Sequence, residues 1–168
     1  MKQKIKKYLP DGVYGAIDGV VTTFAIIGGV YGAKLSPLVV LVLGISNVLA
    51  DGFSMAASNF LAKKSEEDDS NHHTAFNSAL TTFFAFVIIG TVPLLPFVIA
   101  LFIPIDFTRQ FVYSIIGTFG AFLFTGFARG RITHRNIFVT CFETVAIGGV
   151  AASIAYGVGV LLKSLGLN

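Results

Sequence analysis

The chain has 168 residues, of which 54% are hydrophobic and only 12% are charged, and its formal net charge at pH 7 is +3. A soluble domain carries about 25% charged residues, so this composition is typical of a membrane protein, and the small positive charge does not indicate nucleic-acid binding. Because a membrane-spanning helix needs about 20 apolar residues, the chain has room for five such helices and for no separate soluble domain.

The apolar runs predict an all-α, multi-pass membrane protein in which residues 1–168 form a single domain. Pro93 and Pro96 lie inside the third run, and we expect them to kink that helix. Glycines at a spacing of four, such as Gly15 and Gly19, predict close helix packing and a face of the first helix that could contact a second copy. In chain order, the five predicted spans are about 11–33, 36–62, 75–103, 108–128 and 137–162.

Lysine and arginine residues divide unevenly between the two ends of these spans. With the N-terminus in the cytoplasm, nine of them lie on the cytoplasmic side and three on the other side. The positive-inside rule therefore predicts a cytoplasmic N-terminus and, after five spans, a C-terminus outside. We interpret Arg129, Arg131 and Arg135 as topology determinants near anionic lipid headgroups.

The first two spans carry acidic residues inside apolar sequence. Asp18 lies in the first and Asp51 in the second, where even lenient insertion scales give a cost of about 2.5–3.5 kcal/mol for a carboxylate. Asp11, at the cytoplasmic edge, costs little. Helical periodicity puts polar side chains on the same faces and predicts a path from mid-membrane to the cytoplasm. The residues expected on these faces are Thr22, Asn47, Ser54, Met55 and Asn59.

The fifth span carries a third acid, Glu143. At 1.5 Å per residue, Asp18, Met55 and Glu143 all lie about 10 Å from the cytoplasmic surface, and Asp51 lies about 6 Å deeper. Carboxylate oxygen with thioether sulfur suits Fe²⁺, Mn²⁺ or Co²⁺ better than Mg²⁺ or Ca²⁺, so we expect these four residues to be metal ligands. The alternatives are a space-filling Met55 and separately hydrogen-bonded acids. Because protons compete with metal for carboxylate oxygens, H⁺ is the expected coupling ion.

The connector after the second span is strongly acidic. It could concentrate cations before they enter the path, or it could be a solvated polar turn, because no spacing within it matches a closed metal site. The residues concerned are Glu66, Glu67, Asp68, Asp69, His72 and His73.

Several motifs resemble the vacuolar iron transporter family of plants, fungi and many prokaryotes. They are Asp11-Gly-x5-Asp18-Gly19 in the first span and Asn47-x6-Ser54-Met55-Ala56 in the second. The resemblance implies a five-helix homodimer in the lipid bilayer that moves Fe²⁺, and in some members Mn²⁺, out of the cytosol against protons without a resident cofactor. By the same likeness, Asp18 and Met55 are ligands of the transport path, which the first helices line.

Some residues depart from the family pattern. A second-helix glutamate of plant members falls on Asn47 here, so its role is either lost or taken over by Asp51. Glu143 stands where many relatives have arginine. Only the short run 63–74 replaces the long, glutamate-rich cytoplasmic insert of plant and yeast members. This short form favours a prokaryotic plasma membrane over a vacuolar one.

Two other classes of function use membrane carboxylates. An intramembrane aspartyl protease needs two aspartates, but Asp18 and Asp51 differ in estimated depth and nothing else indicates a peptide site. A small proton-coupled exporter of organic cations remains the main alternative, against which Met55 and the acidic connector argue. We therefore expect a secondary transporter and not an enzyme.

Overall fold

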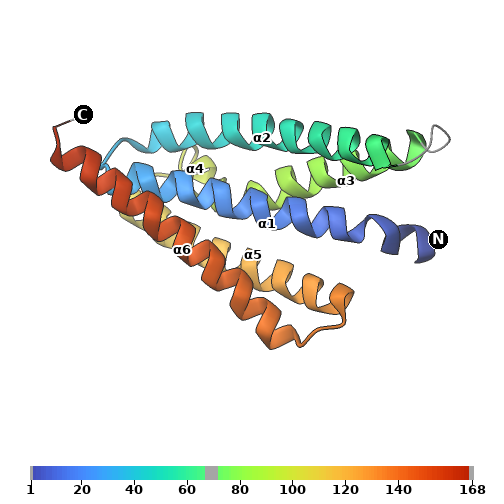
Figure 1. Cartoon of the computed structure of the whole chain (residues 1–168). Helices are drawn as coiled ribbons and strands as arrows, with labels where there is room; N and C mark the ends of the chain where they lie inside the picture. The colour runs from blue at the N-terminus through green and yellow to red at the C-terminus, as the bar shows by residue number, and fades with distance from the viewer. Residues whose placement is uncertain (1, 67–71, 167–168) are drawn as a thin grey trace.

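The computed structural model describes residues 2–66 and 72–166, with side chains described for 7–65 and 73–166. This part of the chain is built from helices and contains no strand (Figure 1). The elements are α1 (Lys2–Gly32), α2 (Pro37–Glu66), α3 (His72–Gly90), η1 (Val92–Leu94), α4 (Leu95–Ile99), α5 (Phe107–Thr133) and α6 (Ile137–Ser164).

Five helical segments of the described chain are long and apolar enough to cross a membrane, which confirms the five predicted spans. Their bounds differ from the prediction by several residues: α1 begins at Lys2 and not near residue 11, and α5 continues to Thr133 and not to about 128. That helix ends because His134 takes a left-handed conformation, with φ 51°, and donates its backbone N–H to Gly130.

The predicted kink in the third span is confirmed and is a full interruption of the helix. The α3 helix ends at Gly90, a single 3-10 turn contains Pro93, and the short α4 follows. Proline lacks a backbone N–H, so the α-helical hydrogen-bond pattern cannot run through this point. Ser114 Oγ on α5 donates a 2.8 Å hydrogen bond to the Pro93 carbonyl oxygen, which satisfies one acceptor inside the membrane span.

The α1 helix is the centre of the bundle, and glycines set how closely its neighbours approach. A Cβ atom added at Gly15 or Gly19 would lie 2.5 Å from the Thr82 carbonyl oxygen or 2.6 Å from that of Phe86, both on α3. Farther along, Gly32 of α1 lies directly against the backbone of Tyr156 on α6. The predicted close packing is therefore confirmed, and in this chain α3 and α6 occupy the glycine faces of α1.

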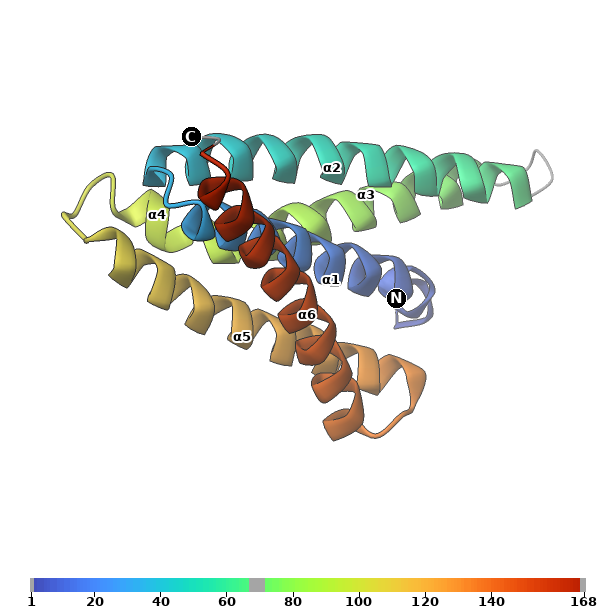
Figure 2. The same ribbon diagram turned by 60° about the vertical axis from the view of Figure 1, so that its left-hand side comes forward.

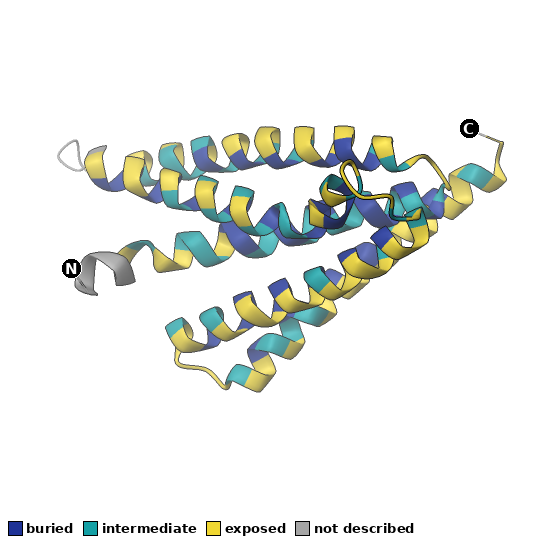
Figure 3. Cartoon of the chain, turned by 180° about the vertical axis from the view of Figure 1, so that it is seen from behind, coloured by how far each residue is buried: buried dark blue, intermediate teal, exposed yellow. Residues whose placement is uncertain are grey.

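The helices form two groups that separate toward one end of the molecule. The α1, α2 and α3 helices stay side by side, whereas the α5–α6 hairpin diverges from them toward the end that holds the N-terminus (Figure 2). At the opposite end α6 crosses α1, and the two termini lie at opposite ends. We call these the N-terminal end and the C-terminal end. Buried residues line the facing sides of the helices, and exposed ones, including Phe53 and Phe142, cover the outside as expected for lipid-facing surfaces (Figure 3).

Candidate functional site

The structure brings together Asp18 on α1 and Asp51 on α2. Both side chains are half-buried, and the Asp51 carboxylate is close enough for its charge to repel that of Asp18. Among the residues with described side chains, neither carboxylate forms an ion pair. Two neighbouring carboxylates in apolar surroundings repel each other, so a cation between them would be stabilised by both charges.

The register between α1 and α2 places Met55 at the level of Asp18. These two helices run antiparallel (Figure 1), and Asp11 accepts hydrogen bonds from both Asn59 and Lys63. Because both helices rise 1.5 Å per residue, the same register puts Asp18 opposite residues 52–56. The half-buried Met55 lies in that range, and Asp51 lies within one turn of it. Two carboxylates and a thioether therefore lie within about one helical turn of each other along α1 and α2.

The other polar residues predicted to line the path lie in different surroundings. Asn47 is half-buried, and its Nδ2 has no hydrogen-bond partner among the described residues. Thr22 Oγ1 donates a 2.8 Å bond to the backbone carbonyl oxygen of Asp18, so its hydroxyl is used within α1. Ser54 is exposed on α2. Of these three, Asn47 is therefore the best placed to offer a free polar group one turn beyond Asp51.

Sequence reasoning missed the role of Asp11, which is the centre of a polar cluster. Its carboxylate accepts hydrogen bonds from Lys63 Nζ at 2.7 Å, from Asn59 Nδ2 at 3.3 Å and from Ser78 Oγ. Asn59 also donates to Thr82 Oγ1 at 2.7 Å. We call these five residues the Asp11 cluster. It ties α1 to α2 and α3 at the N-terminal end, so Asn59, expected to line the path, has a structural role here. The sequence feature that could have indicated this role is the spacing of four between Asn59 and Lys63, which puts both side chains on one face of α2.

Glu143 lies apart from the two aspartates. Its carboxylate pairs with Arg129 of α5 at 2.9 Å, and both side chains are partly exposed. Where α1 and α6 touch, Gly28 faces Ala152, and this register would put Glu143 near the level of Asp18. The sequence-based depth therefore agrees with the register, but α6 has diverged from α1 at that height (Figure 1). Arg129, interpreted from sequence as a topology determinant, is also the ion-pair partner of this acid.

No three His, Cys, Asp or Glu side chains among those described lie close enough together to hold one metal ion. One copy of the chain thus supplies two carboxylates and a thioether at the candidate site, with Glu143 elsewhere. The acidic connector lies mostly outside the described residues. Of its candidate capture residues, His73 is described and exposed at the start of α3, whereas the side chains of Glu66, Glu67, Asp68, Asp69 and His72 are outside the described set.

Comparisons with known proteins identify one family and several named relatives. A model of the VIT family matches residues 9–75 and 69–160. "Vacuolar iron transporter 2" of Oryza sativa subsp. japonica is 25% identical over 219 aligned positions, which cover 92% of this chain and 87% of the relative. "Vacuolar iron transporter 1" of Eucalyptus grandis is 26% identical over 218 positions, covering 92% and 86%. A shorter match, 38% identical over 56 residues, links 33% of this chain to 20% of "Vacuolar iron transporter" of Plasmodium falciparum.

The alignments also bear on the connector between α2 and α3. The two segments matched by the family model overlap at residues 69–75, a range that runs from the connector into the start of α3. The 219 aligned positions exceed the 168 residues of this chain, so the rice relative has positions with no counterpart here. Both observations agree with the expectation that relatives carry an insert at this point and that this chain has only a short link.

Proposed function

The chain belongs to the VIT family, and from this premise we propose that it exports Fe²⁺ from the cytosol across a membrane in exchange for protons, with Mn²⁺ as a second candidate substrate. The observation that carries the proposal is the Asp18–Asp51 pair. The charges of these carboxylates repel each other, both lie within about one helical turn of the level of Met55, and neither has a compensating cation among the described residues. A divalent cation would neutralise both charges.

The donor types support a transition metal as the cargo. Asp18 and Asp51 offer hard oxygen atoms and Met55 offers a polarisable sulfur atom, a mixture that favours Fe²⁺ or Mn²⁺ over Mg²⁺ or Ca²⁺. Met55 can reach a metal held between the carboxylates because the register of α1 against α2 puts it at the same level. The printed names of the relatives, which specify iron, support the same choice.

Proton exchange follows from the same oxygen atoms. A metal binds deprotonated carboxylates, so each loading event releases protons and each protonation event releases metal. A proton gradient directed into the cytosol would therefore reload the acids and expel the cation. The basic residues at the N-terminal end support a cytoplasmic location for that end, with the prokaryotic plasma membrane as the proposed location.

A second copy of the chain would complete the metal's coordination. One chain supplies fewer ligands than the six of an octahedral site, and no third acid, histidine or cysteine lies nearby in the described part of the chain. We therefore propose a homodimer in which the polar faces of the two α1 helices line a common path. We also retain the acidic connector, residues 66–73, as a segment that concentrates cations at the cytoplasmic entrance.

The test is Fe²⁺ flux into proteoliposomes under reducing conditions, with and without an imposed pH difference. The parent protein should move Fe²⁺ faster when the pH difference favours proton counterflow, and Asp18→Asn and Asp51→Asn should each lower that flux about 100-fold. Asp106→Asn is the matched control, because Asp106 is an exposed acid at the C-terminal end and asparagine also caps helices well. An Fe²⁺ flux that is the same with and without the pH difference would exclude proton coupling. Transport of a quaternary amine in place of Fe²⁺ would favour the organic-cation alternative.

A further inference from the structure

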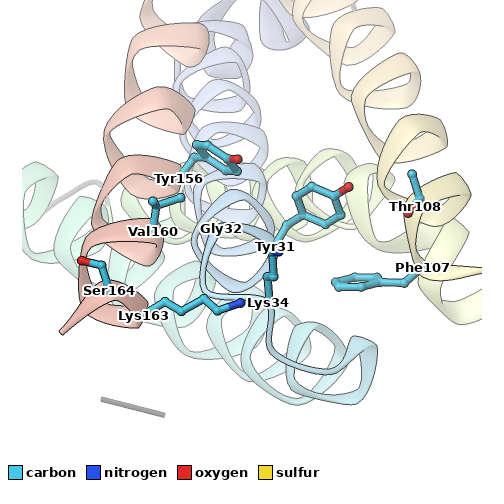
Figure 4. Close-up of a pocket in the computed structure, with 9 residues that line it drawn as sticks. All are labelled: Tyr31, Gly32, Lys34, Phe107, Thr108, Tyr156, Val160, Lys163 and Ser164. Atoms are coloured by element: carbon cyan, nitrogen blue, oxygen red, sulfur yellow. The ribbon is translucent and has the colours of Figure 1, made fainter. Parts of the chain in front are cut away.

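A cavity of about 760 Å³ with several polar side chains in its lining lies at the C-terminal end, where α1, α5 and α6 meet (Figure 4). It is distinct from the candidate metal site, because Gly32 in its wall is 14 residues beyond Asp18, or about 21 Å along the axis of α1. The polar side chains in its lining are Tyr31, Lys34, Thr108, Tyr156, Lys163 and Ser164.

The charge of this cavity is one-sided. Lys163 extends from α6 toward the end of α1, where Lys34 lies (Figure 4), and no carboxylate is part of the lining. Asp106, the acid before α5, caps that helix and pairs with Arg109 at 3.0 Å. Among residues with described side chains, neither lysine forms an ion pair. Two ammonium groups on one cavity repel each other, so an anion bound between them would be stabilised by both.

Aromatic packing and a close backbone contact hold two walls of the cavity. Tyr31 stacks on Phe111, with ring centroids 3.8 Å apart, and meets Phe107 edge to face at 5.3 Å. On the opposite wall, Gly32 allows the backbone of Tyr156 to lie directly against α1. Lys34 has φ 57° at the end of α1, a left-handed position where glycine is usual, so here a cation stands where the fold alone would favour glycine.

We propose that this cavity binds a phosphate group, carried either by an anionic lipid headgroup or by free inorganic phosphate. Lysine ammonium groups are common phosphate ligands, and the hydroxyls of the lining add neutral donors around them. Thr108 lies in the first turn of α5, a 27-residue helix whose N-terminus carries a partial positive charge. The cavity also lies at the ends of membrane spans, the depth at which lipid phosphates are found.

The experiment measures phosphate binding by the full chain, independently of metal transport. One arm titrates inorganic phosphate into protein in a maltoside detergent and phosphate-free buffer, followed by calorimetry. A second arm counts retained phosphatidylglycerol against phosphatidylcholine by native mass spectrometry. Both arms compare the parent with the double variant Lys34→Gln/Lys163→Gln, with Lys34→Arg/Lys163→Arg as the rescue and Arg109→Gln as a cation control from the same end outside the cavity.

The double glutamine variant should weaken binding roughly tenfold or more, because each charge-assisted hydrogen bond to phosphate contributes substantially. The arginine variant and Arg109→Gln should bind as the parent does. Binding in the calorimetric arm identifies free phosphate as a ligand, and preferential retention of phosphatidylglycerol identifies a lipid headgroup. The proposal is overturned if the parent binds neither, or if Arg109→Gln loses as much binding as the double glutamine variant while all proteins keep the same melting temperature.

Discussion

Asp11 and Asp18 lie seven residues apart on the same face of α1, yet their surroundings are opposite in kind. Asp11 has a lysine, a serine and an asparagine around its carboxylate, whereas Asp18 has no cationic partner among the described residues and is repelled by the charge of Asp51. An acid surrounded by donors stabilises the contact between helices, but an acid facing another acid costs stability. An acid inside a membrane span therefore indicates a transport path only when no donor or cation of the same chain neutralises its charge.

Asp18→Asn is the change with the largest expected effect on this comparison. Because it removes one of two repelling charges, Fe²⁺ flux should fall about 100-fold, equivalent to about 2.7 kcal/mol, while the free energy of unfolding stays equal or increases. Flux in proteoliposomes and unfolding in detergent, measured on the same preparation, test both halves. Loss of stability together with flux would mean that Asp18 belongs to the packing and not to the path.

Asp11→Ala should show the reverse pattern. Lys63 and Ser78 lose their charged partner, so we expect about 2 kcal/mol of destabilisation, with flux per folded molecule nearly unchanged. The side chains of Asp11 and Lys63 are only 15% and 27% exposed, so water cannot fully replace the lost contact. A double-mutant cycle with Lys63→Ala isolates the pair. A coupling energy of zero between Asp11 and Lys63 would show that the Asp11 cluster does not stabilise the contact between the helices.

The sequence predicted the larger features of the fold because they depend on local signals. Hydropathy located five spans, Pro93 located the break in the third, and glycine spacing predicted close packing. It could not predict which way α6 leaves α1. Counting residues gives the depth of Glu143. Because the α5–α6 hairpin diverges from α1, however, this acid forms an ion pair with Arg129 and lies away from Asp18.

The role of Asp11 was missed for a similar reason. The free-energy cost of an acid at the membrane edge is small, so the estimated depth of Asp11 did not indicate that it needs hydrogen-bond partners. Its partners come from α2 and also from α3, and the packing of α3 against α1 cannot be counted along a short connector. By contrast, Asp18, Asp51 and Met55 come from two helices joined by a short connector, so their levels could be estimated from the sequence.

Met55→Leu should have an intermediate effect. Leucine has a similar volume, so stability should change by less than about 1.5 kcal/mol, but the sulfur ligand is lost. We expect Fe²⁺ affinity to fall about 10-fold and Mn²⁺ affinity to fall less, because manganese prefers oxygen ligands more strongly. Competition between the two metals in the flux assay measures the ratio. If the ratio of Fe²⁺ flux to Mn²⁺ flux is unchanged in the variant, Met55 fills space and is not a metal ligand.

Glu143→Gln should have the smallest effect. Its ion pair with Arg129 is partly exposed on both sides, and such pairs contribute about 0–1 kcal/mol. Flux should stay within about threefold of the parent, because that ratio corresponds to less than 1 kcal/mol. The same flux assay, with Arg129→Gln as the matched variant, checks this. A loss as large as that of Asp18→Asn would establish Glu143 as a ligand, as its depth first indicated.

The most direct measurement is the position of a bound metal in the protein. Crystals of the full chain soaked in Co²⁺ or Mn²⁺ and measured at the metal's absorption edge would locate the ion by anomalous scattering. We expect a peak between Asp18 and Asp51, within bonding distance of the Met55 sulfur atom. A peak at the Asp11 cluster or at Glu143, with the space between Asp18 and Asp51 empty, would contradict it.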